Sequence, residues 1–219
     1  MFTYYKKRVI IAMPKLLKGG CTLMKKKTIV FIGAPGAGKG SRIEECVKIG
    51  YTPISSGNLL RKAGFDLSSG KLIEDGIVVS LVKDAIEKTE GNIILDGFPR
   101  TISQAEELEK QCIAVDKIIF IDISCEEAVR RAVNRLICSK CQAVYTKTAY
   151  KPPKKEGICD LCGESLTQRS DDNEETVRKR FSIFEELTFP ILDFYKSKGI
   201  EIAVFDAETD ADEKILSMI

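Results

Sequence analysis

Histidine is absent from the 219-residue sequence. Without histidine, no catalytic step can use an imidazole base, and any bound metal must be held by Cys, Asp or Glu side chains. Long apolar runs are also absent, since none approaches the roughly 18 residues that a membrane-spanning helix needs. We therefore expect no membrane partner. The composition, 44% hydrophobic and 30% charged, is typical of a globular protein with a buried core.

Acidic residues are missing from the first 27 positions, which contain eight lysines and arginines. The whole chain has 34 basic and 32 acidic residues, so the remainder has 26 basic and 32 acidic residues and is mildly acidic. This balance does not favour a nucleic-acid partner. We expect residues 1–23 to be an extension ahead of a start at Met24. A targeting segment is the alternative, although the short apolar run that ends at Pro14 is unlike a signal peptide.

Short apolar runs alternate with helical patterns along the rest of the chain. The runs are rich in β-branched residues and predict buried parallel strands. They cover residues 28–33, 51–55, 92–98, 117–123 and 200–207. Helical spacing covers residues 39–49, 56–64, 72–88, 124–137, 174–187 and 189–199, with a split near Pro190 and a short last helix from Asp210. This alternation predicts an α/β fold, with three α/β/α layers around a five-stranded parallel sheet.

Residues 138–172 interrupt the alternation of strands and helices. They contain four cysteines, the stretch KPPKKEG and little apolar periodicity. We interpret them as an insertion into a core domain formed by residues 24–137 and 173–219.

The stretch GAPGAGKGS follows the first predicted strand and leads into the first predicted helix. It matches the phosphate-binding pattern G-x-x-x-x-G-K-[ST] at Gly33, Gly38 and Lys39, with Ser41 one position late because Gly40 intervenes. Glycines allow backbone N–H groups to surround phosphate oxygens, and the helix N-terminus adds a favourable dipole. The alternative is a glycine-rich turn without a ligand, but the strand before it and the helix after it favour a phosphate site.

The loop and three later motifs resemble the adenylate kinase family of nucleoside monophosphate kinases. The later motifs are SSGNLLR at residues 55–61, LDGFPRTISQAEEL at residues 95–108 and QRSDDNEETVRKR at residues 168–180. They occur in the family's order. The resemblance implies a P-loop kinase fold, a segment at about residues 55–80 that binds the nucleoside monophosphate, and transfer of a phosphoryl group from ATP–Mg²⁺ to AMP, giving two ADP.

The resemblance also implies a role for each matching residue. The implied ATP-binding residues are Gly33, Ala34, Pro35, Gly36, Ala37, Gly38, Lys39, Gly40, Ser41, Arg131 and Arg135. The implied AMP-binding residues are Ser56, Arg61, Ile73, Gly97, Arg100, Gln104, Arg169 and Arg180. The implied catalytic residues are Lys39, Asp96, Arg100, Arg135, Arg169 and Arg180. In these roles Gln104 reads the adenine of AMP, Arg131 stacks on the adenine of ATP, and Asp96 holds water ligands of Mg²⁺. Planar arginine forks suit phosphate geometry, and phosphoryl transfer depends mainly on positioning and charge neutralisation.

Four cysteines in the insertion have the spacing C-x₂-C-x₁₇-C-x₂-C, at Cys138, Cys141, Cys159 and Cys162. This spacing is typical of a four-thiolate zinc site, and a short insertion with few apolar residues gains stability from such a metal. Disulfides and free thiols are the alternatives, and iron can also occupy four thiolates. The resemblance fits zinc, because one class of bacterial adenylate kinases has a zinc-binding lid.

The segment after Arg61 departs from the family pattern. Only eight residues, KAGFDLSS, separate Arg61 from Gly70, where longer family members have about twice as many. Transfer to AMP is the leading hypothesis, and an acceptor such as CMP, UMP or GMP is the alternative. A zinc-ribbon module that binds nucleic acid is a third, weaker hypothesis. We expect ATP, AMP and ADP as the partners of a cytoplasmic monomer.

Overall fold

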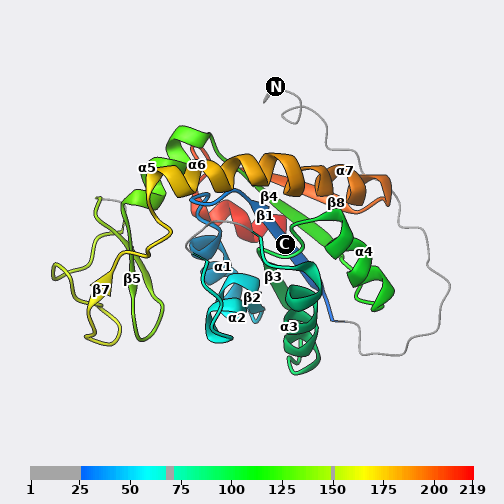
Figure 1. Ribbon diagram of the computed structural model, residues 1–219, viewed down its shortest axis with the longest axis horizontal. Coiled ribbons are helices and arrows are strands. Elements are labelled where there is room, and N and C mark those ends of the chain that lie inside the picture. Colours follow the sequence, from blue (N-terminus) through cyan, green and yellow to red (C-terminus); the bar gives the residue numbers. More distant parts are fainter. Residues whose placement is uncertain (1–25, 68–71, 149–150) are drawn as a thin grey trace.

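The computed structural model describes residues 26–67, 72–148 and 151–219 (Figure 1). The extension predicted for residues 1–23 lies outside the described residues. The strands are β1 Thr28–Gly33, β2 Thr52–Ser55, β3 Ile93–Asp96, β4 Lys117–Asp122, β5 Arg135–Cys138, β6 Val144–Thr146, β7 Leu166–Thr167 and β8 Glu201–Asp206. The helices are α1 Lys39–Lys48, α2 Ser56–Lys62, α3 Asp75–Glu87, α4 Ile102–Lys110, α5 Cys125–Val133, α6 Glu174–Ile183 and α7 Pro190–Ser197, with the π-turn η1 Phe184–Thr188 and the 3₁₀ helix η2 Asp212–Met218.

Five strands form a parallel sheet in the order β2-β3-β1-β4-β8. The predicted five-stranded parallel sheet is therefore confirmed. The order changes direction at β1, whose two neighbours are reached by separate crossovers. In such sheets the crevice at the carboxyl end of the central strand is where ligands bind. Gly33 at the end of β1 and Asp96 at the end of β3 both lie at this edge.

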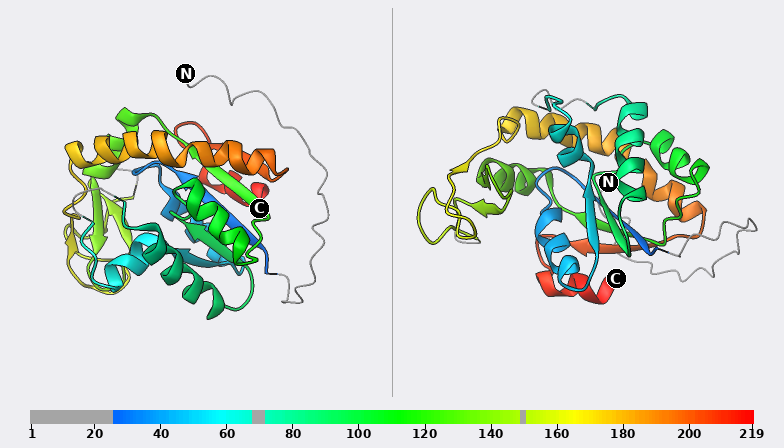
Figure 2. Two further views of the ribbon diagram at one scale, coloured as in Figure 1. Left: turned by 45° about the vertical axis from the view of Figure 1, so that its right-hand side comes forward. Right: turned by 90° about the horizontal axis from the view of Figure 1, so that it is seen from below.

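Alternate residues of the central strands pack on opposite faces of the sheet, as a fully buried strand requires. Val30 and Ile32 of β1 belong to a core cluster with residues of α3, α4 and α7. Ile29 and Phe31 belong to a second cluster with residues of α1, α5, α6 and η2. Figure 2 shows these two helical layers on either side of the sheet. The three-layer α/β/α prediction is therefore confirmed.

Helices α6 and α7 form one nearly continuous rod, although the sequence predicts a split near Pro190 (Figure 1). The π-turn η1 joins them, and the Phe189 N–H donates to the Phe184 carbonyl at 2.8 Å. Pro190 is tolerated because it stands at the first position of α7, where a backbone N–H has no helical partner. The extra residue in a π-turn also turns the Thr188 side chain toward the sheet edge, where its hydroxyl donates to the Arg100 carbonyl at 2.9 Å.

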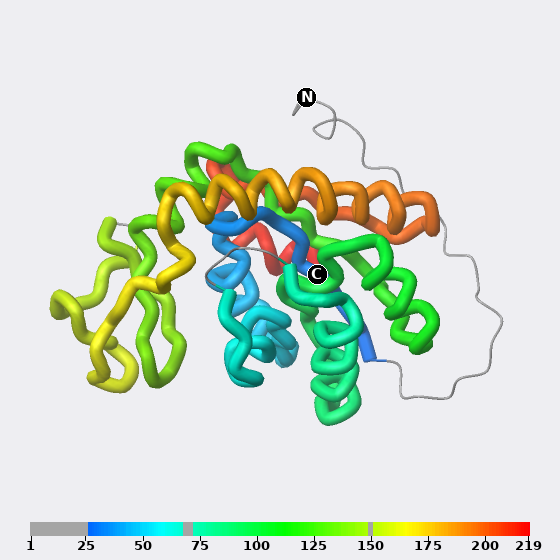
Figure 3. The backbone as a smooth tube through the Cα atoms, viewed as in Figure 1, coloured from blue at the N-terminus to red at the C-terminus, as the bar shows by residue number. Residues whose placement is uncertain are grey.

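The insertion forms a separate antiparallel sheet in the order β6-β5-β7. The helix predicted for residues 124–137 is too long, because α5 ends at Val133 and residues from Arg135 pair with β6 as strand β5. The pairing of β5 with β6 outweighs the local helical pattern. Figure 3 shows this small sheet projecting beside α5, on the side away from α4. Within the described ranges, no helix combines the length and apolar character needed to cross a membrane.

Candidate active site and four-cysteine cluster

The glycine-rich loop lies at the carboxyl edge of the sheet, between β1 and α1. Gly36 and Gly38 have φ values of 82° and 78°, a left-handed conformation that other residues rarely adopt. A Cβ atom on Gly36 would lie 2.2 Å from the carbonyl oxygen of Ala128, so only glycine fits against α5. The loop therefore packs against α5 on one side and lines the cleft on the other.

Lys39 opens helix α1, and its ammonium group points back over the loop. Its Nζ donates to the carbonyls of Gly33 at 2.6 Å and Ala34 at 3.1 Å. The Lys39 pKa is lowered to about 8, mainly by burial; the nearby Asp96 opposes this effect, and the charges of Arg100, Arg180 and Arg135 add to it. An anionic ligand is the group that best relieves this desolvated cation.

Five arginines from separate elements surround the same region. Arg61 comes from α2, Arg100 follows β3, Arg135 begins β5, Arg169 follows β7 and Arg180 lies on α6. All five line one cleft with Lys39, and its volume is about 630 Å³. This volume lies in the range of about 300–1,000 Å³ that is usual for ligand sites. The structure thus brings the sequence-predicted basic residues together.

Two buried aspartates hold the arginines in place. Asp171 Oδ2 accepts from Arg180 Nη1 at 2.6 Å and lies 3.7 Å from Arg61 Nη2. Asp172 forms a bidentate pair with Arg135, with a distance of 2.8 Å from Nε to Oδ2. The two carboxylates are 4% and 1% exposed, so they are shielded from solvent and orient the guanidinium forks firmly.

The cleft has more positive than negative charge. Burial lowers the pKa of both Arg100 and Arg169 to about 10, so both remain protonated at neutral pH. Among the described residues, Lys39, Lys62 and eight arginines line the cleft, against the carboxylates of Glu44 and Asp96 in its lining and of Asp171 and Asp172 beside it, so positive charge predominates. This excess is suited to binding several phosphate groups.

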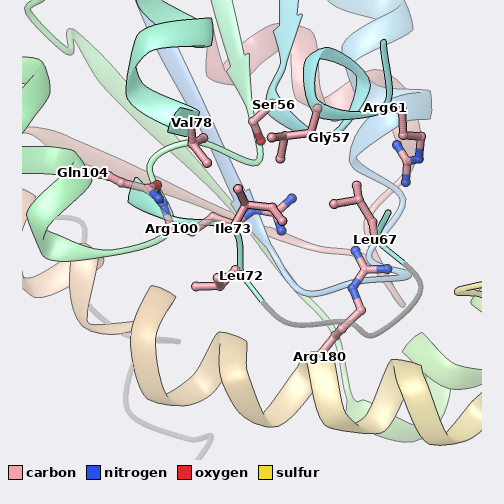
Figure 4. A pocket seen from close by; sticks show the side chains of 11 residues that line it. Ser56, Gly57, Arg61, Leu67, Leu72, Ile73, Val78, Arg100, Gln104 and Arg180 are labelled. Atoms are coloured by element: carbon pink, nitrogen blue, oxygen red, sulfur yellow. Dashed lines mark hydrogen bonds between the residues drawn. The ribbon is translucent and has the colours of Figure 1, made fainter. Parts of the chain in front are cut away.

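A second pocket opens beside the cleft and combines an apolar wall with arginines. Its lining residues are Ser56, Gly57, Leu60, Arg61, Leu67, Leu72, Ile73, Val78, Arg100, Gln104 and Arg180. In Figure 4 the residue Gln104 lies at one side of this pocket, and Arg61 and Arg180 lie at the other. The apolar wall suits the face of a flat base and the arginines suit a phosphate, but the pocket has a volume of only about 40 Å³ and must widen to admit a nucleotide.

Two sequence-predicted residues, Ser56 and Arg131, have protein partners around these pockets. The Ser56 hydroxyl donates to the Gly97 carbonyl at 2.5 Å, which ties α2 to the end of β3. Arg131 donates from Nε to Glu127 at 2.6 Å and from Nη2 to the Ala207 carbonyl at 2.8 Å, and it lines the cleft. Stacking of Arg131 on adenine remains a prediction.

The sequence analysis missed Arg42, which supports the glycine-rich loop through a hydrogen bond to its backbone. Arg42 is 3% exposed, pairs with Asp212 at 2.7 Å and lies 5.0 Å from the centre of the Phe205 ring. Its Nη1 also donates to the Gly38 carbonyl at 3.1 Å. A basic residue directly after Ser41 is the only local sign of this role in the sequence. Its partners Asp212 and Phe205 lie about 165 residues further along the chain, so a local sequence pattern cannot identify them.

The four cysteines of the insertion meet at one point. Cys138 and Cys162 are 3.4 Å apart between their Sγ atoms, Cys141 and Cys159 are 3.5 Å apart, and all four Sγ atoms lie within 4.8 Å of one another. A disulfide would need about 2.05 Å. Tetrahedral zinc with Zn–S bonds of about 2.3 Å places its sulfurs about 3.8 Å apart, so the cluster fits a closed metal site.

Hydrogen bonds favour a thiolate within this cluster. Burial raises the pKa of Cys159, but the Tyr145 hydroxyl and backbone N–H groups of the following turn outweigh burial and lower the pKa to about 6. The Tyr145 oxygen lies 3.6 Å from the Cys159 sulfur and accepts from the Asp160 N–H at 2.9 Å. Because metals bind thiolates, this environment prepares one of the four ligands.

Comparison with known proteins shows which family this chain resembles. The family model described as "Adenylate kinase" matches residues 31–200. Among curated relatives, an adenylate kinase of Caldicellulosiruptor bescii is 40% identical over 202 residues, covering 84% of this chain and 94% of that protein. An adenylate kinase of Streptomyces coelicolor is 38% identical over 203 residues, covering 84% and 93%. One from Archaeoglobus fulgidus is 40% identical over 192 residues, covering 78% and 87%.

A glycine-rich loop at the switch point of a parallel sheet, with a lysine and five arginines around one cleft, defines a P-loop enzyme that transfers phosphoryl groups between nucleotides. Within this class, the family model that matches residues 31–200 and the relatives that align with most of the chain are all adenylate kinases. The chain belongs to the adenylate kinase family. The resemblance stated from the four sequence motifs is therefore confirmed.

Proposed function

We propose that the protein transfers a phosphoryl group reversibly from ATP–Mg²⁺ to AMP, giving two ADP. The observation that carries this proposal is the pair of adjoining pockets that share Arg61, Arg100 and Arg180. One contains the glycine-rich loop and Lys39, and the other contains Gln104. Two nucleotides bound in these pockets would direct their phosphates toward the same three arginines.

The donor side is formed by the loop and Lys39. The Lys39 ammonium now donates to the Gly33 and Ala34 carbonyls, and it would exchange these contacts for phosphate oxygens without moving far. Arg135 and Arg180 would neutralise charge on the transferring group, because phosphoryl transfer requires positioning and electrostatic stabilisation more than covalent chemistry. The reaction needs no imidazole, which agrees with the absence of histidine.

The acceptor side is formed by the second pocket. Leu60, Val78 and Ile73 provide an apolar wall for a base, and Arg61 and Arg100 face the phosphate end. Gln104 is buried at the pocket wall, where its amide can read the edge of adenine. The curated relatives are named adenylate kinases, which does not favour the alternative of a different acceptor or of a nucleic-acid-binding module.

Two metal ions belong to this proposal. Asp96 lines the cleft at the end of β3 and is the residue that would hold water ligands of the nucleotide-bound Mg²⁺, which supplies charge neutralisation at the phosphates. The four cysteines would hold a structural Zn²⁺ that replaces a hydrophobic core in the small sheet.

We also propose that the protein is a monomer and is located in the cytoplasm. Its proposed domains are a core of residues 24–137 and 173–219, an acceptor segment at about residues 55–80 and a lid at residues 138–172.

Activity toward four acceptors tests the proposed reaction. ADP formation from ATP–Mg²⁺ is measured with AMP, GMP, CMP and UMP in turn. We expect a strong preference for AMP, because an amide at the pocket wall can pair with adenine in two places. A preference for CMP or UMP would contradict the assignment, and no turnover with any of the four would contradict the proposed reaction.

The rate at low ATP concentration should depend on the protonation of Lys39. Its pKa in the free enzyme is about 8, mainly because of burial, and bound phosphates favour the charged form. ATP therefore binds best below pH 8, and kcat/KM for ATP should fall by up to about tenfold per pH unit above pH 8. A pH profile from 6.5 to 9.5 checks this. The variant Lys39→Arg should lose the inflection, since arginine remains protonated throughout.

Removal of one cysteine ligand should release the lid metal. Cys159→Ser is expected to reduce metal content from about one zinc per chain to near zero and to lower the melting temperature by about 5 °C, which corresponds to about 2 kcal/mol for a chain of this size. Elemental analysis and thermal melting measure the two effects. Cys112→Ser is the matched control, because Cys112 is exposed and outside the cluster. Iron in the purified protein, or unchanged zinc in the variant, would contradict the assignment.

A further inference from the structure

The side-chain amide of Gln104 is closed into a network with two different partners. Gln104 is only 2% exposed. Its Oε1 accepts from the backbone N–H of Arg100 at 2.7 Å, and its Nε2 donates to Asp75 Oδ1 at 2.6 Å. Both ends of the amide are therefore held before any nucleotide binds.

The chemistry of the two partners allows one orientation of this amide. A backbone N–H can only donate, and a carboxylate can only accept. The amide oxygen must therefore face Arg100 and the amide nitrogen must face Asp75. Each end keeps one further interaction for a ligand, namely a second lone pair on the oxygen and a second N–H on the nitrogen. A flip of the amide would place a donor against a donor and an acceptor against an acceptor.

Both partners are themselves fixed by the tertiary structure. Asp75 is the first residue of α3, and its Oδ2 accepts from the Thr101 hydroxyl at 2.9 Å. The same Thr101 hydroxyl caps α4 by accepting from the Gln104 N–H at 3.1 Å. On the other side, the Arg100 carbonyl accepts from Thr188 of η1 at 2.9 Å. Three elements thus hold one amide in one orientation.

This orientation matches one kind of purine. Adenine presents the N6 amino donor beside the N1 acceptor, so it pairs with an amide oxygen that accepts and an amide nitrogen that donates. Hypoxanthine, which has no 2-amino group, presents O6 as an acceptor and N1–H as a donor, and therefore requires the flipped amide. We propose that Asp75 is a positioning residue that sets the preference for a 6-aminopurine over a 6-oxopurine monophosphate by fixing the orientation of Gln104. The inference rests on the proposed function, since it assigns the determinant of acceptor choice at that same site.

The test compares AMP with IMP as acceptors, because their bases differ only at the positions that Gln104 would read. The measured quantity is the ratio of kcat/KM for AMP to kcat/KM for IMP, with ATP–Mg²⁺ as donor. In Asp75→Ala, water can fill the space of the carboxylate and can either donate or accept, so the amide is free to flip more often. We expect the ratio to fall about tenfold, the effect of losing one charge-assisted hydrogen bond.

Two variants serve as controls. Asp75→Asn keeps a carbonyl oxygen that can accept from Gln104 Nε2, and it should preserve most of the wild-type ratio. Glu74→Ala removes an exposed charge at the neighbouring position and should leave the ratio unchanged. A general loosening of α3 would reduce turnover of both nucleotides alike and would not change their ratio. If Asp75→Ala melts below the assay temperature, Asp75→Ser repeats the test with a hydroxyl that can either donate or accept and so imposes no orientation on the amide.

The outcomes separate this inference from the function on which it rests. Wild-type protein that transfers nothing to AMP contradicts the proposed function. Wild-type protein that prefers AMP to IMP, with the same ratio in Asp75→Ala, overturns the role of Asp75 alone. If the AMP/IMP ratio falls equally in Asp75→Asn and Asp75→Ala, the role of Asp75 is also overturned, because the oxygen that accepts from Gln104 Nε2 would then have no effect on the ratio.

Discussion

Replacement of Lys39 with methionine is expected to lower kcat by about 10²–10³-fold, the effect typical of removing one preorganised electrostatic contact to a transition state. Methionine keeps most of the apolar length of the side chain but has no charge. The ammonium is buried at the loop, where its attraction to phosphate is screened less than at the surface. The loop itself should remain folded, because Gly36 and Gly38 and their backbone contacts are unchanged.

Steady-state kinetics with saturating AMP measures the effect of Lys39→Met. Lys48→Met is the matched control, since Lys48 lies at the exposed end of the same helix and forms an ion pair with Glu45. The control should retain wild-type kcat, because a surface ion pair contributes at most about 1 kcal/mol to stability and nothing to the cleft. A kcat within threefold of wild type in Lys39→Met would show that Lys39 does not contact the reacting phosphates.

Replacement of Arg100 with alanine is expected to lower kcat/KM for AMP by about 10³-fold, equivalent to about 4 kcal/mol of transition-state stabilisation. Arg100 lines both pockets and is half-buried, and burial is the main cause that lowers its pKa to about 10. Its Nε donates to the Gly97 carbonyl at 2.8 Å, which aims the remaining nitrogens into the space between the pockets.

Arg100→Lys distinguishes the charge from the shape of the fork. Lysine restores the charge but cannot bind two phosphate oxygens in one plane, so it should recover only part of the loss. Arg178→Ala is the control, because Arg178 pairs with Glu126 and Glu174 on the protein surface and is absent from the cleft. Wild-type kcat/KM in Arg100→Ala would contradict the shared role of Arg100 in the two pockets.

The buried pairs of Asp171 and Asp172 with arginines explain how the cleft keeps so many cations together. Arg180 and Arg135 would repel each other strongly if neither had a carboxylate partner. The aspartates offset part of this repulsion and also fix the direction of each fork, so little reorganisation remains for the moment of reaction. The remaining positive excess is what an incoming nucleotide neutralises.

The amino-acid sequence by itself was sufficient to predict the sheet, the layers and the position of the glycine-rich loop between β1 and α1. These features depend on local pattern: β-branched apolar runs, helical spacing, and glycines where the backbone turns tightly. It was also sufficient to predict that four cysteines meet, because two C-x₂-C pairs leave few other arrangements, and the cluster in the small sheet agrees with this. The local pattern was misleading at residues 134–137, where strand pairing prevailed, whereas α7 does begin at Pro190.

The partners of the polar side chains were decided only by the tertiary structure. Nothing near Arg42 in the sequence indicates Asp212, and nothing near Gln104 indicates that Asp75 will hold its nitrogen and Arg100 its oxygen. A hydrogen bond depends on a few tenths of an ångström and on direction, and these are set when α3, α4 and η1 pack around the sheet. The sequence therefore determined the family and the kinds of residues in the cleft, while folding determined which atoms of those residues remain available to a nucleotide.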